Sequence, residues 1–236
     1  MARIYVNPAL TNKVFVFKDR WEAGAVLAEM LREKYEGAPE TIVLAIPAGG
    51  VPVGLVIAKE LRLPFDLLIV RKIHFPDNPE AGFGAITFDG EVLLNEELVA
   101  YAGLDESTIE RQIALEKKDL AERERLFRRG KPFPDLSGQT VILVDDGLAS
   151  GYTMLAAVKS VAKRGARKIV VAVPTASERA IKQLSPFVDE IYCPNVRSGA
   201  FFAVADAYQN WYDLSREEVM ALLEEAGYFK SFAGRS

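Results

Sequence analysis

The stretch that most constrains the fold of this chain is residues 141–154, where an apolar run meets two acidic residues and then a loop of small residues. Four consecutive aliphatic residues, 141–144, indicate a strand that is buried on both faces. Asp145 and Asp146 follow it. Because side chains alternate along a strand, these carboxylates point in different directions and could hold two neighbouring hydroxyl groups.

The loop after the acidic pair has the composition of a phosphate site. Gly147 and Gly151 allow backbone N–H groups to turn inward, Ser150 and Thr153 add hydroxyl donors, and a helix is expected to start near Thr153. An ordinary strand that ends in an acidic turn is the alternative, and it leaves the glycines and hydroxyls unexplained. The stretch therefore predicts a site for a sugar 5-phosphate with free vicinal hydroxyls.

Further apolar runs, separated by segments with helical spacing, repeat this strand-and-helix pattern along the chain. They are residues 42–46, 65–70, 168–174 and 190–193, and a short edge strand is expected at 14–17. Continuously apolar strands that alternate with helices predict an α/β fold, a doubly wound parallel sheet with ligands at the carboxyl ends of its strands. With half of its 236 residues hydrophobic, the chain is expected to form a single domain spanning residues 1–236.

A second anion cradle is predicted after the strand at residues 42–46. The turn consists of Ala48, Gly49, Gly50 and Val51, and a helix follows it through Leu61. Missing Cβ atoms let backbone amides approach a ligand closely. The spacing matches neither the dinucleotide-binding fingerprint nor a Walker loop.

Two cations, Arg71 and Lys72, come after the strand at residues 65–70. They are placed to hold a pyrophosphate, although a solvated charge pair is the alternative. The Pro- and Gly-rich residues 74–85 have the composition of a mobile lid that excludes water. The only histidine, His74, could be an acid, a base or a substrate contact, but we favour an exposed loop residue without a role.

Residues 91–131 are predicted to form an insertion in the sheet. A short strand at 92–94 precedes a long charged helix at about 105–129, which has a sparse apolar stripe. The insertion could cover the site as a small hood or build a dimer contact, and the sequence does not choose between these.

Composition excludes several classes of partner. The net charge of −4 gives no basic field for nucleic acid or an anionic membrane.

One cysteine, Cys193, precludes an intrachain disulfide and fits a reducing compartment. No apolar run reaches the length of a membrane span and no signal peptide is recognisable, so we expect a cytoplasmic protein.

The acidic pair and its small-residue loop resemble the signature of the type I phosphoribosyltransferases. Residues 17–24 (FKDRWEAG) and 78–85 (NPEAGFGA) resemble a branch known only as predicted phosphoribosyltransferases. The resemblance implies that Asp145 and Asp146 bind the ribose hydroxyls of phosphoribosyl pyrophosphate (PRPP). It implies a 5-phosphate loop of Gly147, Leu148, Ala149, Ser150, Gly151, Tyr152 and Thr153. It also implies a pyrophosphate site of Ala48, Gly49, Gly50 and Val51 with Arg71 and Lys72.

The resemblance also implies a reaction. The chain would transfer the 5-phosphoribosyl group to a nitrogenous base and release pyrophosphate, with Mg²⁺ bound mainly through PRPP and no direct protein ligand. Phe201 or Phe202 would stack on the base, although core packing is an equal alternative. Ala149 stands where enzymes of 6-oxopurines have an aspartate, so the acceptor is open. We also expect a homodimer.

Two other hypotheses are kept. One is a regulatory protein of the same fold that senses PRPP without catalysis. The other is a doubly wound domain that binds a different phosphorylated metabolite. The presence of Arg71 and Lys72 favours the enzyme.

Overall fold

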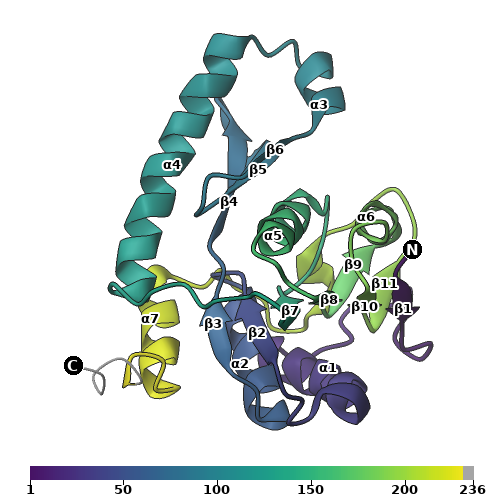
Figure 1. Cartoon of the computed structure of the whole chain (residues 1–236). Helices are drawn as coiled ribbons and strands as arrows, with labels where there is room; N and C mark the ends of the chain where they lie inside the picture. The colour runs from purple at the N-terminus through teal and green to yellow at the C-terminus, as the bar shows by residue number, and fades with distance from the viewer. Residues whose placement is uncertain (231–236) are drawn as a thin grey trace.

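A six-stranded parallel sheet forms the centre of the molecule in the computed structural model, which describes residues 1–230 (Figure 1). Its strand order is β1-β10-β8-β7-β2-β3. The strands are β1 (Arg3–Tyr5), β2 (Thr41–Ala45), β3 (Phe65–Leu67), β7 (Thr140–Val144), β8 (Lys168–Ala172) and β10 (Glu190–Tyr192). The predicted α/β fold with a parallel sheet is confirmed.

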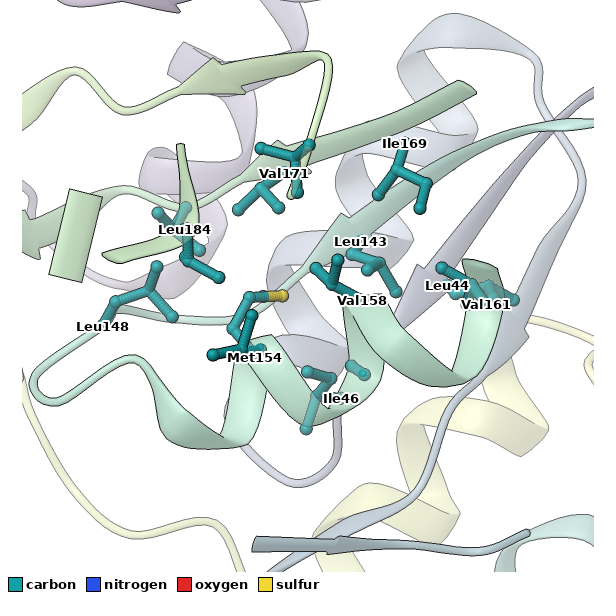
Figure 2. Packing of buried hydrophobic residues seen from close by; sticks show 14 of the residues in the cluster. Leu44, Ile46, Leu143, Leu148, Met154, Val158, Val161, Ile169, Val171 and Leu184 are labelled. Atoms are coloured by element: carbon teal, nitrogen blue, oxygen red, sulfur yellow. The ribbon is translucent and has the colours of Figure 1, made fainter. Parts of the chain in front are cut away.

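Helices cover both faces of this sheet. They are α1 (Arg20–Tyr35) and α2 (Gly50–Leu61) on one face, and α5 (Tyr152–Lys163) and α6 (Glu178–Leu184) on the other. Alternation along β7 divides its side chains between the two layers. Ile142 packs with α1 and α2, whereas Leu143 packs with α5. Figure 2 shows Met154, Val158 and Val161 of α5 over Leu44 and Leu143 of the sheet.

An arm of three antiparallel strands and two helices rises beside the sheet (Figure 1). Its elements are β4 (Val70–Phe75), β5 (Asn78–Thr87), β6 (Val92–Leu94), α3 (Glu96–Tyr101) and α4 (Glu106–Arg128). The long helix and the short strand that were expected at residues 91–131 are both present. The arm begins earlier than that, because the predicted strand at 65–70 ends at Leu67 and β4 starts a second sheet.

Residues 76–85 form a tight turn and most of strand β5, so the prediction of a lid loop at 74–85 was wrong for the described structure. The glycines that suggested a loop instead permit close strand pairing. A Cβ on Gly82 would lie 2.4 Å from Cγ of Lys72, and one on Gly84 would lie 2.5 Å from the Leu93 carbonyl oxygen. Phe83 between them is fully buried.

Three short elements form a cap over the loop after β7: β9 (Thr175–Ser177), β11 (Asn195–Arg197) and the 3-10 helix η1 (Val204–Ala207). The C-terminal helix α7 (Arg216–Glu225) lies apart from this cap. Strands β9 and β11 pair in parallel, and Leu148 bridges to Ala176 of β9. Helix α7 packs near α2.

The edge strand predicted at residues 14–17 does not form. Asn12 and Phe15 adopt positive φ angles of 57° and 54°, which interrupt an extended backbone. The segment bonds instead to the C-terminal part of the chain, where the Phe17 N–H donates to the Ala207 carbonyl. Strand β1 forms the edge of the sheet next to β10.

A buried ionic cluster near that edge gives a stability prediction. The Glu190 carboxylate accepts hydrogen bonds from Lys34 at 2.9 Å, Lys168 at 3.1 Å and the Tyr35 hydroxyl. Burial by itself would raise its pKa, but these hydrogen bonds outweigh burial and lower the pKa from 4.5 to about 2. Because the folded pKa is depressed, the cluster stabilises the fold above about pH 4.5, and this contribution is lost as the pH falls towards 2.

We expect Glu190→Gln to lower the free energy of unfolding at pH 7 by about 2–3 kcal/mol, since two ammonium groups lose their counter-charge. The difference from wild type should shrink as the pH falls from 4.5 towards 2. Urea unfolding at a series of pH values measures this. Glu33→Gln, at an exposed position of α1, is the matched control. A deficit that stays constant with pH would contradict the assignment.

Candidate active site

The two predicted cradles lie side by side at the carboxyl ends of β2 and β7. These strands pair in parallel with Ala45 opposite Val144, so the loops after them leave the sheet together. A Cβ on Gly49 would lie 1.9 Å from Oδ2 of Asp146, which shows how closely the Asp146 carboxylate rests on the glycine turn. The structure therefore brings the acidic pair and the Gly49–Gly50 turn into one site.

The acidic pair is in a poorly solvated position. Burial raises the pKa of Asp145 well above its ordinary value, and the neighbouring Asp146 charge raises it further. Burial also raises the pKa of Asp146, although Arg20 opposes the shift. The Asp146 backbone N–H donates to Oδ1 of Asp145 at 2.8 Å and fixes its rotamer. A ligand with two hydroxyl donors would stabilise the ionised form of these carboxylates by hydrogen bonding.

Arg20 is a site residue that our sequence reasoning missed. Its Nε donates to Oδ2 of Asp146 at 3.0 Å, and its side chain is only 4% exposed. The sequence feature that could have identified Arg20 is its place in the 17–24 motif. It directly follows Asp19, which caps α1. An arginine at the start of a helix is usually expected to be exposed. Nothing in the neighbouring sequence indicates that its partner is Asp146, 126 positions away.

The predicted phosphate loop, residues 147–153, ends at the N-terminus of helix α5. Helix α5 starts after Gly151, whose φ is 81° and which has no side chain to cap the helix, and the Tyr152 N–H makes only a long 3.5 Å hydrogen bond to Oγ of Ser150. The free N–H groups and the positive end of the helix dipole can therefore receive an anion. Ser177 of β9 ties the loop to the cap by donating to the Ala149 carbonyl at 2.7 Å. The loop from Gly147 to Thr153 thus lies where the sequence predicted it.

Arg71 and Lys72 are not together, because they lie on opposite faces of β4. Nε of Arg71 pairs with Asp119 at 2.7 Å and with Glu116 at 3.3 Å, both on α4. Lys72 instead lines a cavity of about 250 Å³ with Ser150 and Thr153 of the phosphate loop.

The interpretation of His74 as an exposed loop residue was wrong. It lies on β4, and its side chain is 20% exposed. Its Nδ1 is 2.7 Å from Oε1 of Glu116, the residue that also contacts Arg71. His74 therefore belongs to the side-chain contacts that join β4 to α4.

A larger cavity of about 570 Å³ adjoins the phosphate loop on the side of the cap. Its walls include Ala149, Ser150, Ser177, Arg179 and Phe202. Of the two aromatic residues proposed to stack on a base, Phe202 lines this cavity, whereas the Phe201 side chain is 93% exposed. The cavity offers an aromatic wall and polar groups next to the loop.

Comparison with known proteins assigns this chain to a protein family. The model of the phosphoribosyl transferase domain matches residues 18–196, which include both loops and the acidic pair. The chain therefore belongs to the phosphoribosyl transferase domain family, and the resemblance seen in the sequence is confirmed.

Two similar proteins stand out. A Mycobacterium tuberculosis protein with the provisional name phosphoribosyl transferase Rv0571c is 39% identical over 214 residues, or 89% of this chain and 47% of the relative. The chain thus spans about half the length of the curated relatives it matches. The crystal structure of TT1426 from Thermus thermophilus is 37% identical with a TM-score of 0.71, and the match covers 89% of this chain and 98% of that one. Among residues 1–230, no helix is both long and apolar enough to span a membrane.

Proposed function

We propose that this chain transfers the 5-phosphoribosyl group of PRPP to a nitrogenous acceptor and releases pyrophosphate. The observation that supports this most directly is the contact between the acidic pair and the glycine turn, because it joins a diol site to an anion cradle. An uncapped helix N-terminus adds a phosphate site next to them. PRPP carries a phosphate, a diol and a pyrophosphate in the corresponding order.

Each part of the donor has a partner in this proposal. Asp145 and Asp146 accept hydrogen bonds from the two ribose hydroxyls, and residues 147–153 surround the 5-phosphate. The backbone of residues 48–51 holds the pyrophosphate. Lys72 is already beside the phosphate loop, whereas Arg71 reaches an anion only after it leaves Asp119 and Glu116.

The chemistry asked of the protein is electrostatic. The bond from the anomeric carbon to pyrophosphate breaks, the bond to the acceptor nitrogen forms, and that nitrogen gives up its proton. Positive charge grows on the sugar as the leaving group departs, and the nearby carboxylates of Asp145 and Asp146 stabilise it. Lys72 is the cation of the pair that can stabilise the departing anion, since Arg71 is paired with Asp119 and Glu116 on the other face of β4.

We also propose that Mg²⁺ enters with PRPP. Among the described residues 1–230, no group of three or more His, Cys, Asp or Glu side chains is arranged to hold a metal. The pyrophosphate oxygens are the hard ligands that Mg²⁺ prefers, and the ion would neutralise their charge. Within residues 48–51, Ala48 and Gly49 would then contact the pyrophosphate through backbone amides, because the N–H groups of Gly50 and Val51 donate to the carbonyls of Ile46 and Ala48.

The cavity beside Phe202 is our candidate for the acceptor. It adjoins Ala149, which has no side-chain acceptor for a purine ring nitrogen, so we do not propose a 6-oxopurine. The homodimer and the cytoplasmic location expected from the sequence stay predictions.

Pyrophosphate release tests this function. Purified protein, PRPP and Mg²⁺ are incubated with a panel of purines, pyrimidines and other heterocyclic amines. We expect release that depends on one class of acceptor and yields the matching nucleotide. PRPP binding without release on any acceptor would favour a PRPP-sensing protein.

A further inference from the structure

A buried arginine outside both loops contacts one carboxylate of the site. Arg20 is the first residue of α1 and is 3% exposed, although arginine is seldom buried without partners. Besides Asp146 at 3.0 Å, its guanidinium donates from Nη1 to the Tyr212 carbonyl at 2.8 Å. It also lies 4.1 Å from the ring centroid of Trp211. These contacts fix the guanidinium in one orientation.

Asp146 is consequently held from three directions. Arg20 holds its carboxylate from α1, and the Gly49 turn packs against the same oxygen. Tyr208 of the C-terminal segment donates its hydroxyl to the Asp146 backbone carbonyl at 2.6 Å. The carboxylate and the backbone of one residue are therefore positioned by segments from both ends of the chain.

The charge of Asp146 depends on this arrangement. The titratable groups that face it are Asp145 from the same strand end, Arg20 from α1 and Tyr208 from the C-terminal segment. Burial raises the pKa of Asp146, and Arg20 is the cation that opposes the shift. A protonated Asp146 would lose one of the acceptor sites that a ribose diol requires.

We propose that Arg20 is a positioning residue, which supplies the counter-charge of Asp146 and keeps its carboxylate aimed at the ribose hydroxyls of the donor. This proposal rests on the proposed function, because it names the donor as the ligand of Asp146. A different role would be a purely structural tie between α1 and the C-terminal segment. That role predicts a loss of stability without any change in the titration of Asp146.

The test compares Arg20→Gln and Arg20→Lys with wild type, and Arg32→Gln is the control. Arg32 lies on the same helix in exposed ion pairs with Glu29, Glu36 and Glu60. PRPP affinity is measured by calorimetry at a series of pH values, because burial raises the pKa of Asp146. The carboxyl carbon of Asp146 is titrated by NMR without ligand. Its signal is assigned as the one that is missing from the spectrum of Asp146→Asn.

We expect Arg20→Gln to weaken PRPP binding about tenfold or more, since a charge-assisted hydrogen bond is lost. The pH at which affinity falls, and the NMR midpoint of Asp146, should both move higher. Arg20→Lys should recover part of each effect because it keeps the charge, and it also serves if the Gln variant does not fold. Arg32→Gln should match wild type.

An unchanged NMR midpoint and unchanged pH dependence in both Arg20 variants would overturn the proposal, even if their melting temperatures fall. Absence of PRPP binding by wild-type protein would instead refute the proposed function. The ligand-free titration would then still decide whether Arg20 controls the charge of Asp146.

Discussion

Replacing Asp145 and Asp146 together with asparagine is expected to abolish measurable PRPP binding. Asparagine keeps the shape of each side chain but replaces an ionised acceptor with an amide. If each carboxylate contributes one charge-assisted hydrogen bond to the ribose, the loss exceeds about a hundredfold in affinity. The variant also leaves Arg20 without its counter-charge, so thermal unfolding has to be measured beside calorimetry.

The control for this double variant is Asp135→Asn. Asp135 is exposed and precedes β7, so it lies at the end of the strand opposite to the site. It should bind PRPP as wild type does. Normal affinity in the folded double variant would refute the assignment of the acidic pair to the ribose.

A single methyl group at Gly49 is expected to have nearly as large an effect on binding. The backbone of Gly49 has φ −62° and ψ −30°, which alanine adopts without strain. The new Cβ would nevertheless lie 1.9 Å from Oδ2 and 2.4 Å from Cγ of Asp146. Gly49→Ala should therefore displace the carboxylate, weaken its buried ion pair with Arg20 at some cost in stability, and lose PRPP affinity by about tenfold or more.

Gly90→Ala is designed to give the opposite result. Gly90 has φ 88°, and no atom lies within 4 Å of a Cβ built there. Alanine at this position should cost about 1 kcal/mol of stability through backbone strain and leave binding unchanged. Calorimetry and urea unfolding on both variants separate the two effects. Wild-type affinity in Gly49→Ala would mean that the contact between Gly49 and Asp146 does not shape the donor site.

The parts of the site that can be predicted from the sequence depend on local pattern. Continuous apolar runs identify β2 and β7, and the carboxyl ends of parallel strands lie at one edge. The acidic pair and the Gly49 turn can therefore be assigned to one site from the sequence alone. Arg20 cannot, because its partner is 126 positions away and its burial depends on Trp211 and Tyr212 from the other end of the chain.

In the arm, local composition predicts the wrong structure. Glycines and prolines near β5 have the composition of a mobile loop, yet Gly82 and Gly84 serve close pairing with β4 and β6. The cations Arg71 and Lys72 suggest one group because they are neighbours in sequence. Neighbouring residues on a strand face opposite ways, so the two side chains point apart. The Arg71 side chain forms ion pairs with carboxylates of α4.

The most direct test of the central claim is titration calorimetry of the wild-type protein with PRPP and Mg²⁺. If the two loops and the acidic pair form one donor site, PRPP binds with one site per chain. Ribose 5-phosphate and pyrophosphate, as the two halves of the donor, should bind more weakly and compete with it. Absence of any heat of binding at millimolar PRPP, with the protein shown to be folded, would contradict the account.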